Sequence, residues 1–280
     1  MNNLTLNSNA FNRDYRFVPT QSAPQHAMRV QLDLPQDEEF STTAKAVGVA
    51  GLLRLAQYGL EKLSGVCSAA LMAGKEFAPR EDVEKVANTM KKEKGLSAYI
   101  HYIDHKNKVG LQNMFPNLSK SLDVVADGRN AFYTNQGNFV VAPKSKPSLI
   151  LHELGHAINF EKSSVMRGLQ KLRVVGMFAP MAIAALNNAS GAKRDGKKNF
   201  WERNAGTIGF CAFLPTIIEE AAASIRGINA AKKTLGSNAN LKVLKKNYFL
   251  AWMTYLLAGI GTGIAAKLAI TDVPDVKINI

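Results

Sequence analysis

Residues 150–157 read ILHELGHA and contain two histidines, His152 and His156, four positions apart. Positions four apart on an α-helix lie one turn above each other on the same face, so both imidazoles can bind one metal ion. Glu153 lies about 100° round the helix, where it can contact a water on that metal without being a ligand. Zinc suits such a site, because it accepts histidine and carboxylate ligands and a catalytic site keeps one position for water. That water becomes acidic near neutral pH, and Glu153 can accept its proton.

The competing interpretation is a surface helix that carries two histidines by chance. The chain contains only five histidines, and two of them stand here at ligand spacing. The residues around the motif are also more apolar than an exposed helix normally is; they are Leu149, Ile150, Leu151, Leu154, Ala157 and Ile158. The pattern therefore predicts a buried helix with a metal site.

A third ligand is needed, because catalytic zinc sites take three protein ligands. Glu219 and Glu220 follow an apolar run and precede small residues that allow close approach to the motif helix. Neighbouring helix positions point about 100° apart, so one of these two carboxylates can face the metal. The alternative is an ordinary acid pair at a helix start, where it interacts favourably with the helix dipole. His101 and His105 are expected to be surface or sheet residues.

The composition narrows the classes of partner. The chain has 280 residues and a net charge of +13, from 35 basic and 22 acidic residues. A basic excess suits nucleic acid, an anionic membrane surface or an acidic partner. The lysines are scattered without interleaved aromatic residues, so we expect no nucleic-acid partner. Two cysteines make no disulfide framework, which favours a reducing compartment.

We expect an α+β fold, mainly α, in four regions. They are a disordered polar tail (1–41), an apolar or amphipathic helical segment (42–78), a region around the motif helix (79–164) and an apolar helical region with the acid pair (165–280). In the third region a small sheet should precede the motif helix. Its expected elements are a helix over 80–93 ended by Gly95, a strand at 98–103, a hairpin from 131–133 and 138–142, and a helix start capped by Ser148.

Three runs in the last region carry no charged residue, namely 174–191, 205–218 and 247–266. A 20-residue helix spans about 30 Å, the thickness of the hydrocarbon layer, so these runs predict membrane helices. The second run is short and has to continue past Glu219. If the first two runs form a hairpin, His156 and Glu220 lie on the same side, where basic residues slightly predominate; this favours a cytoplasmic-facing site. Tyr248 is expected at the membrane interface. A soluble α-helical domain is the alternative.

The order of these motifs resembles the bacterial YugP-type membrane zinc metallopeptidases. The matching parts are HELGHA, the two-segment apolar hairpin, Glu220 with Ala223, Ser224 and Arg226, and Thr254-Tyr255 in a final apolar segment, over about residues 80–270. The resemblance implies a zincin-like core of the gluzincin type, with one Zn²⁺ per chain. It selects Glu220 over Glu219 as the third ligand and leaves Glu219 to orient a ligand histidine. It also implies a bacterial inner membrane.

The sequence thus predicts a membrane-associated zinc metallopeptidase that hydrolyses a peptide or protein substrate, with Glu153 as general base. Arg226 and Tyr255 are candidate transition-state stabilisers, although a structural role is favoured for each. The alternative is a non-catalytic membrane or partner-binding protein with a structural zinc site. A structural site is closed by a fourth protein ligand, whereas a catalytic one keeps an open position. The sequence does not specify an oligomeric state.

Overall fold

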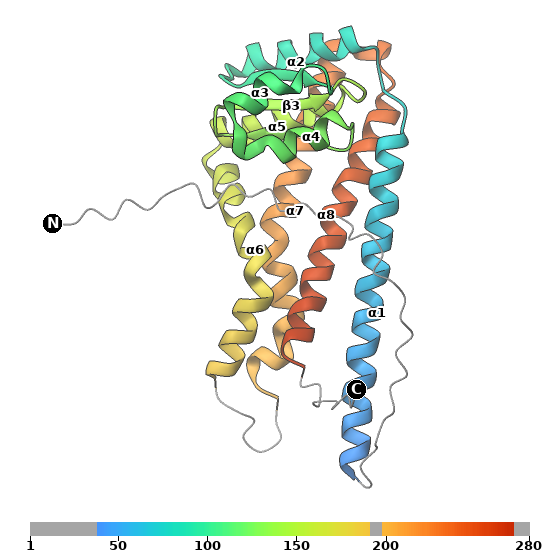
Figure 1. Cartoon of the computed structure of the whole chain (residues 1–280), viewed down its shortest axis with the longest axis vertical. Coiled ribbons are helices and arrows are strands. Elements are labelled where there is room, and N and C mark those ends of the chain that lie inside the picture. Colours follow the sequence, from blue (N-terminus) through green and yellow to red (C-terminus); the bar gives the residue numbers. More distant parts are fainter. Residues whose placement is uncertain (1–37, 191–197, 272–280) are drawn as a thin grey trace, which may run out of the picture.

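A computed structural model describes residues 38–190 and 198–271. Four long helices form a bundle, and a compact cap sits at one end of it (Figure 1). The bundle consists of α1 (Glu38–Ala73), α6 (Ser164–Ala189), α7 (Phe200–Leu235) and α8 (Leu241–Ala269), with a 3-10 turn, η3 (Gly236–Asn238), between α7 and α8. The cap contains α2 (Arg80–Lys94), α3 (Lys108–Met114), η2 (Pro116–Leu118), α4 (Ser119–Ala126) and α5 (Leu149–Lys162) around a small sheet. The prediction of a mainly helical chain with a small sheet before the motif helix and apolar helices after it is confirmed.

The sheet has three strands, β1 (Tyr99–Ile103), β2 (Phe132–Thr134) and β3 (Phe139–Pro143), in the order β1-β3-β2. The predicted strand and hairpin are confirmed: β2 and β3 pair antiparallel, and β1 pairs parallel with β3. The hairpin turn places Gly137 at φ 78° and Asn138 at φ 48°, a left-handed conformation that glycine and asparagine adopt most readily. The parallel pairing requires a crossover, which α3 and α4 provide.

The central strand β3 separates two hydrophobic clusters, because successive side chains of a strand point to opposite faces. Val140 and Ala142 pack in a cluster with residues of α2, α5, α7 and α8. Phe139 and Val141 pack in a second cluster with residues of α3 and α4. The motif helix α5 is therefore covered by the sheet on one side, and its predicted burial is observed from Leu149 to Asn159.

The start of α5 differs from the prediction in one detail. Ser148 occupies the N-cap position, but its side chain makes no capping bond to its own helix. Its backbone N–H and its hydroxyl both donate to the carboxylate of Glu76, each at 3.1 Å. Glu76 lies in the segment that follows α1, so this contact ties the end of α1 to the start of the motif helix.

Helices α5 and α7 touch through their backbones. A methyl group at Gly155 would lie 2.4 Å from the carbonyl oxygen of Ala223, well inside van der Waals contact. On the next turn of α7, a methyl group at Gly227 would lie 3.0 Å from the carbonyl oxygen of Leu151. Small residues at these positions let the side chains on the facing sides of the two helices meet.

The acid pair lies inside α7, not at a helix start. Glu219 and Glu220 are within the helix that runs without a break from Phe200 to Leu235. The interpretation of an acid pair that interacts with a helix N-terminus is therefore wrong. The expected continuation of the short uncharged run past Glu219 is observed.

Three helices, α6, α7 and α8, are long and apolar enough to cross a membrane. Only 17%, 39% and 22% of the residues in their most apolar windows are buried, so most of these residues keep accessible surface, which suits contact with lipid. The link between α6 and α7 includes residues 191–197, which lie outside the described residues, as do residues 1–37 of the predicted tail. Tyr248, expected at the membrane interface, does not face outward: it is buried, and its hydroxyl donates to the carbonyl of Ser148 at 2.7 Å.

The close contact of α5 and α7 can be tested with Gly155→Ala. The added methyl group meets backbone atoms that cannot rotate away, so we expect a loss of about 3 kcal/mol in the free energy of unfolding, the upper end for overpacking. Gly168→Ala in α6 is the matched control, because a methyl group there meets nothing within 4 Å and alanine suits a helix better than glycine. Thermal unfolding of the detergent-solubilised protein measures both. Equal stability of the two variants would contradict the contact.

Candidate metal centre

The two histidines of α5 point into the contact with α7. His152 and His156 are 8% and 6% exposed, and their rings stand edge to face with centroids 4.6 Å apart. The ring of Tyr248 in α8 packs against His152 from the other side, at 5.5 Å between centroids. The imidazoles are therefore held by helix packing on several sides, which fixes the directions of their nitrogen atoms.

One carboxylate oxygen of α7 meets both imidazoles. Glu220 Oε2 lies 3.1 Å from His152 Nε2 and 3.4 Å from His156 Nε2, and the two Nε2 atoms lie 3.0 Å apart. Ligand atoms about 2.0–2.1 Å from a tetrahedral ion lie about 3.3 Å from one another. The three donor atoms thus have the mutual spacing of three tetrahedral ligands, and His152, His156 and Glu220 could hold a metal ion.

The outer nitrogen of each ring has its own partner. His156 Nδ1 donates to Glu219 Oε1 at 2.8 Å, and His152 Nδ1 lies 3.1 Å from the hydroxyl of Ser224. Contacts of this kind fix the tautomer that leaves Nε2 free for a metal. The structure therefore separates the two neighbouring acids: Glu220 faces the Nε2 atoms, and Glu219 orients His156.

Glu219 is the most heavily hydrogen-bonded acid of the site. Its Oε1 accepts from the amides of Asn159 at 2.8 Å and Gln170 at 2.7 Å, in addition to His156. Arg173 of α6 donates to Oε2 of Glu219 at 3.3 Å and also contacts Oε1 of Glu220. Because Arg173 occupies Oε1 of Glu220, Oε2 is the oxygen that remains for a metal.

The two candidate transition-state stabilisers, Arg226 and Tyr255, have different neighbours. Arg226 donates to the side-chain oxygen of Asn159 at 2.6 Å, so it is linked to the metal centre only through Asn159 and Glu219. This contact gives Arg226 a positioning role. Tyr255 of α8 is half-buried and interacts electrostatically with Glu220 and Arg173.

Glu153 differs from the other acids of the site. It is 7% exposed, and within the described part of the chain its carboxylate makes no hydrogen bond. Burial raises the pKa of Glu153, although His156 and His152 oppose the shift. An ionised carboxylate is costly in buried surroundings, so burial favours the protonated form of Glu153.

Arg173, Gln170 and Asn159 were not predicted from the sequence. Asn159 stands three residues after His156 and so lies on the same helix face, which is a signal that could have been used. Arg173 is the last charged residue before the uncharged run of α6. A cation at such a boundary is often a simple interfacial residue, so its contact with the acids of the next helix left no distinct pattern in the sequence.

Comparison with known proteins identifies no family for this chain. No family model matches the chain, and no solved structure matches it. A stretch of 79 residues, 28% of the chain, is 32% identical to the anthranilate phosphoribosyltransferases of two Clostridium kluyveri strains. The chain spans only 24% of the length of these relatives, so the similarity shows neither a family nor an activity for this chain.

The different places of the two acids predict different effects on metal binding. Glu220→Gln removes the negative charge, and because Arg173 should hold the amide oxygen, an NH2 group replaces Oε2 at the metal; stoichiometric binding should be lost. Glu219→Gln should instead weaken the affinity about 10–100-fold, the usual cost of losing a partner of a ligand histidine. Metal content after dialysis against graded chelator measures both. Equal losses in the two variants, or a greater loss in Glu219→Gln, would reverse the assignment.

Metal affinity should also depend on pH. Burial opposes a charge on His156, but the carboxylates of Glu219 and Glu220 outweigh it and raise the pKa of His156 well above its usual value. Without metal His156 therefore keeps a proton at neutral pH, and the metal has to displace it. Affinity should rise about tenfold per pH unit below this raised pKa, so it should be higher at about pH 8 than at about pH 6. Titration calorimetry in buffers of different ionisation enthalpy counts the released proton, and an affinity independent of pH would contradict the expectation.

Proposed function

We propose that this protein is a membrane-associated, zinc-dependent metallopeptidase that hydrolyses peptide bonds. The observation that carries the proposal is the convergence of His152 Nε2, His156 Nε2 and Glu220 Oε2 beside the hydrogen-bond-free carboxylate of Glu153. Three ligands from two helices, with a carboxylate that is not a ligand next to them, is the arrangement that catalytic zinc hydrolysis uses.

The donor set supports zinc among the divalent metals. Two imidazoles and one carboxylate suit a borderline ion that prefers four ligands, whereas magnesium and calcium prefer oxygen donors alone. Zinc bound there would polarise the scissile carbonyl group and lower the pKa of a coordinated water. Within the described residues the cluster offers three ligands and no fourth, which supports a catalytic site with an open position over a closed structural one.

Several residues near the metal ligands have separate roles in the proposed hydrolysis. Glu153 accepts the proton of the attacking water and then donates it to the leaving amine, as a general base and acid. Glu219 holds the ring of His156, and Arg173 holds the pair of carboxylates in place. Tyr255 of α8 is a candidate to stabilise charge on the substrate, because it interacts electrostatically with Glu220.

The same observations support the family resemblance as a proposal. The YugP-type peptidases suggested by the sequence combine HExxH with a distant glutamate, and Glu220 is the acid that meets the two imidazoles here. We extend the proposal to a zincin-like arrangement of the small sheet and α5, and to a bacterial inner membrane with the cap in the cytoplasm. The apolar helices α6, α7 and α8 support the membrane part of this proposal.

A second candidate function is a non-catalytic membrane or partner-binding protein with a structural zinc. The observation that favours it is the depth of the site, since His152, His156 and Glu220 are each no more than 8% exposed. The two functions differ in what Glu153 does. A structural site gives this unbonded acid no task, whereas hydrolysis depends on it.

Glu153→Gln separates the two functions. The amide has the size of the acid but cannot take a proton, so the variant should retain one metal per chain and lose about 10²–10⁴-fold in cleavage rate. Glu81→Gln is the control, because Glu81 is an exposed acid of α2 remote from the centre. Cleavage of a quenched fluorescent peptide library by the zinc-loaded protein measures the rates. If metal-loaded Glu153→Gln cleaves at the wild-type rate, Glu153 is not the general base.

A further inference from the structure

On α6 and α7 the boundary between uncharged and charged residues lies at the level of the metal centre. On α6, Arg173 is the last charged residue before the uncharged residues 174–189, and on α7, Glu219 is the first after the uncharged residues 204–218. Arg173 and Glu219 contact each other at 3.3 Å. Two neighbouring helices therefore change from apolar to charged at the same level, and this level is that of the metal ligands.

On α8 the uncharged run extends past the metal centre toward the cap. It begins after Lys246 and ends before Lys267. Tyr248 packs on His152, and the indole N–H of Trp252 donates to the carbonyl of Ile217 at 3.1 Å. The uncharged runs of α6 and α7 measure about 24 and 22 Å, and that of α8 about 30 Å. A hydrocarbon layer of about 30 Å that covers the α8 run reaches the level of the centre.

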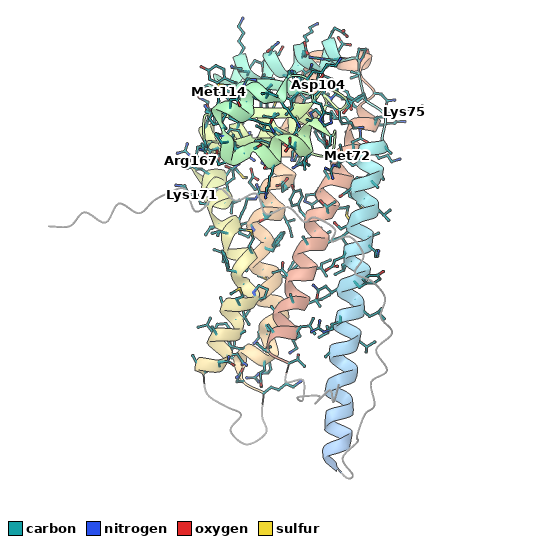
Figure 2. All side chains as sticks on the ribbon, in the orientation of Figure 1. Met72, Lys75, Asp104, Met114, Arg167 and Lys171 are labelled. Carbon is teal, nitrogen blue, oxygen red and sulfur yellow. The ribbon has the colours of Figure 1, made fainter. Side chains whose placement is uncertain are left out.

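The outer surface beside the centre is apolar as well. Leu172, Val175 and Ile218 are 47%, 47% and 46% exposed, although they stand next to Arg173 and Glu219 in the chain. Basic side chains lie just on the cap side of this surface: Figure 2 shows Arg167 and Lys171 where α6 leaves the cap, and Lys75 at the cap end of α1. Apolar side chains below basic ones are typical of the edge of a bilayer, where cations meet lipid headgroups.

We infer that the metal centre works at the edge of the hydrocarbon layer, on polypeptide segments that the membrane itself holds at that depth. The substrate class is the stretch where a membrane-anchored protein leaves the bilayer, and a freely soluble peptide is a poor substrate. This inference rests on the proposed peptidase function for its chemistry. The depth of the centre is independent of that function and can be measured alone.

Trp252 reports the depth. The chain has two tryptophans, so Trp201→Phe leaves Trp252 as the single fluorophore. Its indole donates to the carbonyl of Ile217, two residues before Glu219. The variant is reconstituted into vesicles whose lipids carry bromine close to the headgroup or close to the bilayer centre. We expect stronger quenching by the shallow bromines. Absence of quenching by either lipid, or stronger quenching by the deep bromines, would overturn the placement of the centre.

The substrate class is tested with one cleavable sequence in three forms: free, joined directly to an apolar transmembrane segment, and joined to it through a long flexible spacer. The zinc-loaded full chain in vesicles should cut the directly joined form at least about tenfold faster than the spaced form. The spaced form is the control because tethering raises its local concentration as well. Glu153→Gln supplies the background for each form.

The outcomes separate the two proposals. Glu153-dependent cleavage that is equal for the free and the directly joined forms overturns the substrate class and leaves the peptidase intact. Absence of Glu153-dependent cleavage in all three forms overturns the peptidase and its substrate class together, while the Trp252 measurement still decides the depth. Glu153-dependent release of fatty acid from vesicles without peptide would assign the site to lipid and overturn the polypeptide class.

Discussion

Buried negative charge is the constraint on which the rest of this structure depends. Glu153, Glu219 and Glu220 lie between the cap and the bundle, each 7% exposed or less. Isolated ionised carboxylates are very costly in such surroundings unless they are paired or bind a metal. Arg173 neutralises one charge and His156 a second when it is protonated. A divalent cation that replaced the proton of His156 would offset the remaining charge, so the charges of the cluster suit a metal ion.

The fold provides the closeness that this charge cluster requires. Gly155 and Ala223 let the backbones of α5 and α7 meet, and the two rows of functional side chains face each other as a result. The sheet buries the other side of α5, and α8 covers His152 with Tyr248. The cap thus holds the short helix α5 in contact with the long helix α7. The contact of Ser148 with Glu76 adds a link from α1 to the start of that short helix.

The part of the site that was predicted from the sequence depends on residues close together in the chain. The spacing of His152 and His156 is a property of one helical turn, and the buried character of α5 followed from its neighbours in the chain. The spacing in the sequence did not decide whether Glu219 or Glu220 is the third ligand. Adjacent residues of a helix point in different directions, and only the position of a second helix decides which one faces the histidines. The family resemblance, not the spacing, favoured Glu220. Arg173 went unnoticed, since a cation beside an apolar run looks like an interfacial residue. The short helices α3 and α4 were not predicted from the sequence; they have seven and eight residues.

The central claim is that two imidazoles and one carboxylate bind a single zinc ion and leave a position open. X-ray absorption at the zinc edge of the purified, zinc-loaded protein tests it most directly. We expect one zinc per chain with nitrogen and oxygen neighbours at about 2.0–2.2 Å, and the multiple-scattering pattern of two imidazoles. A spectrum without imidazole scattering, or with sulfur neighbours at about 2.3 Å, would contradict it.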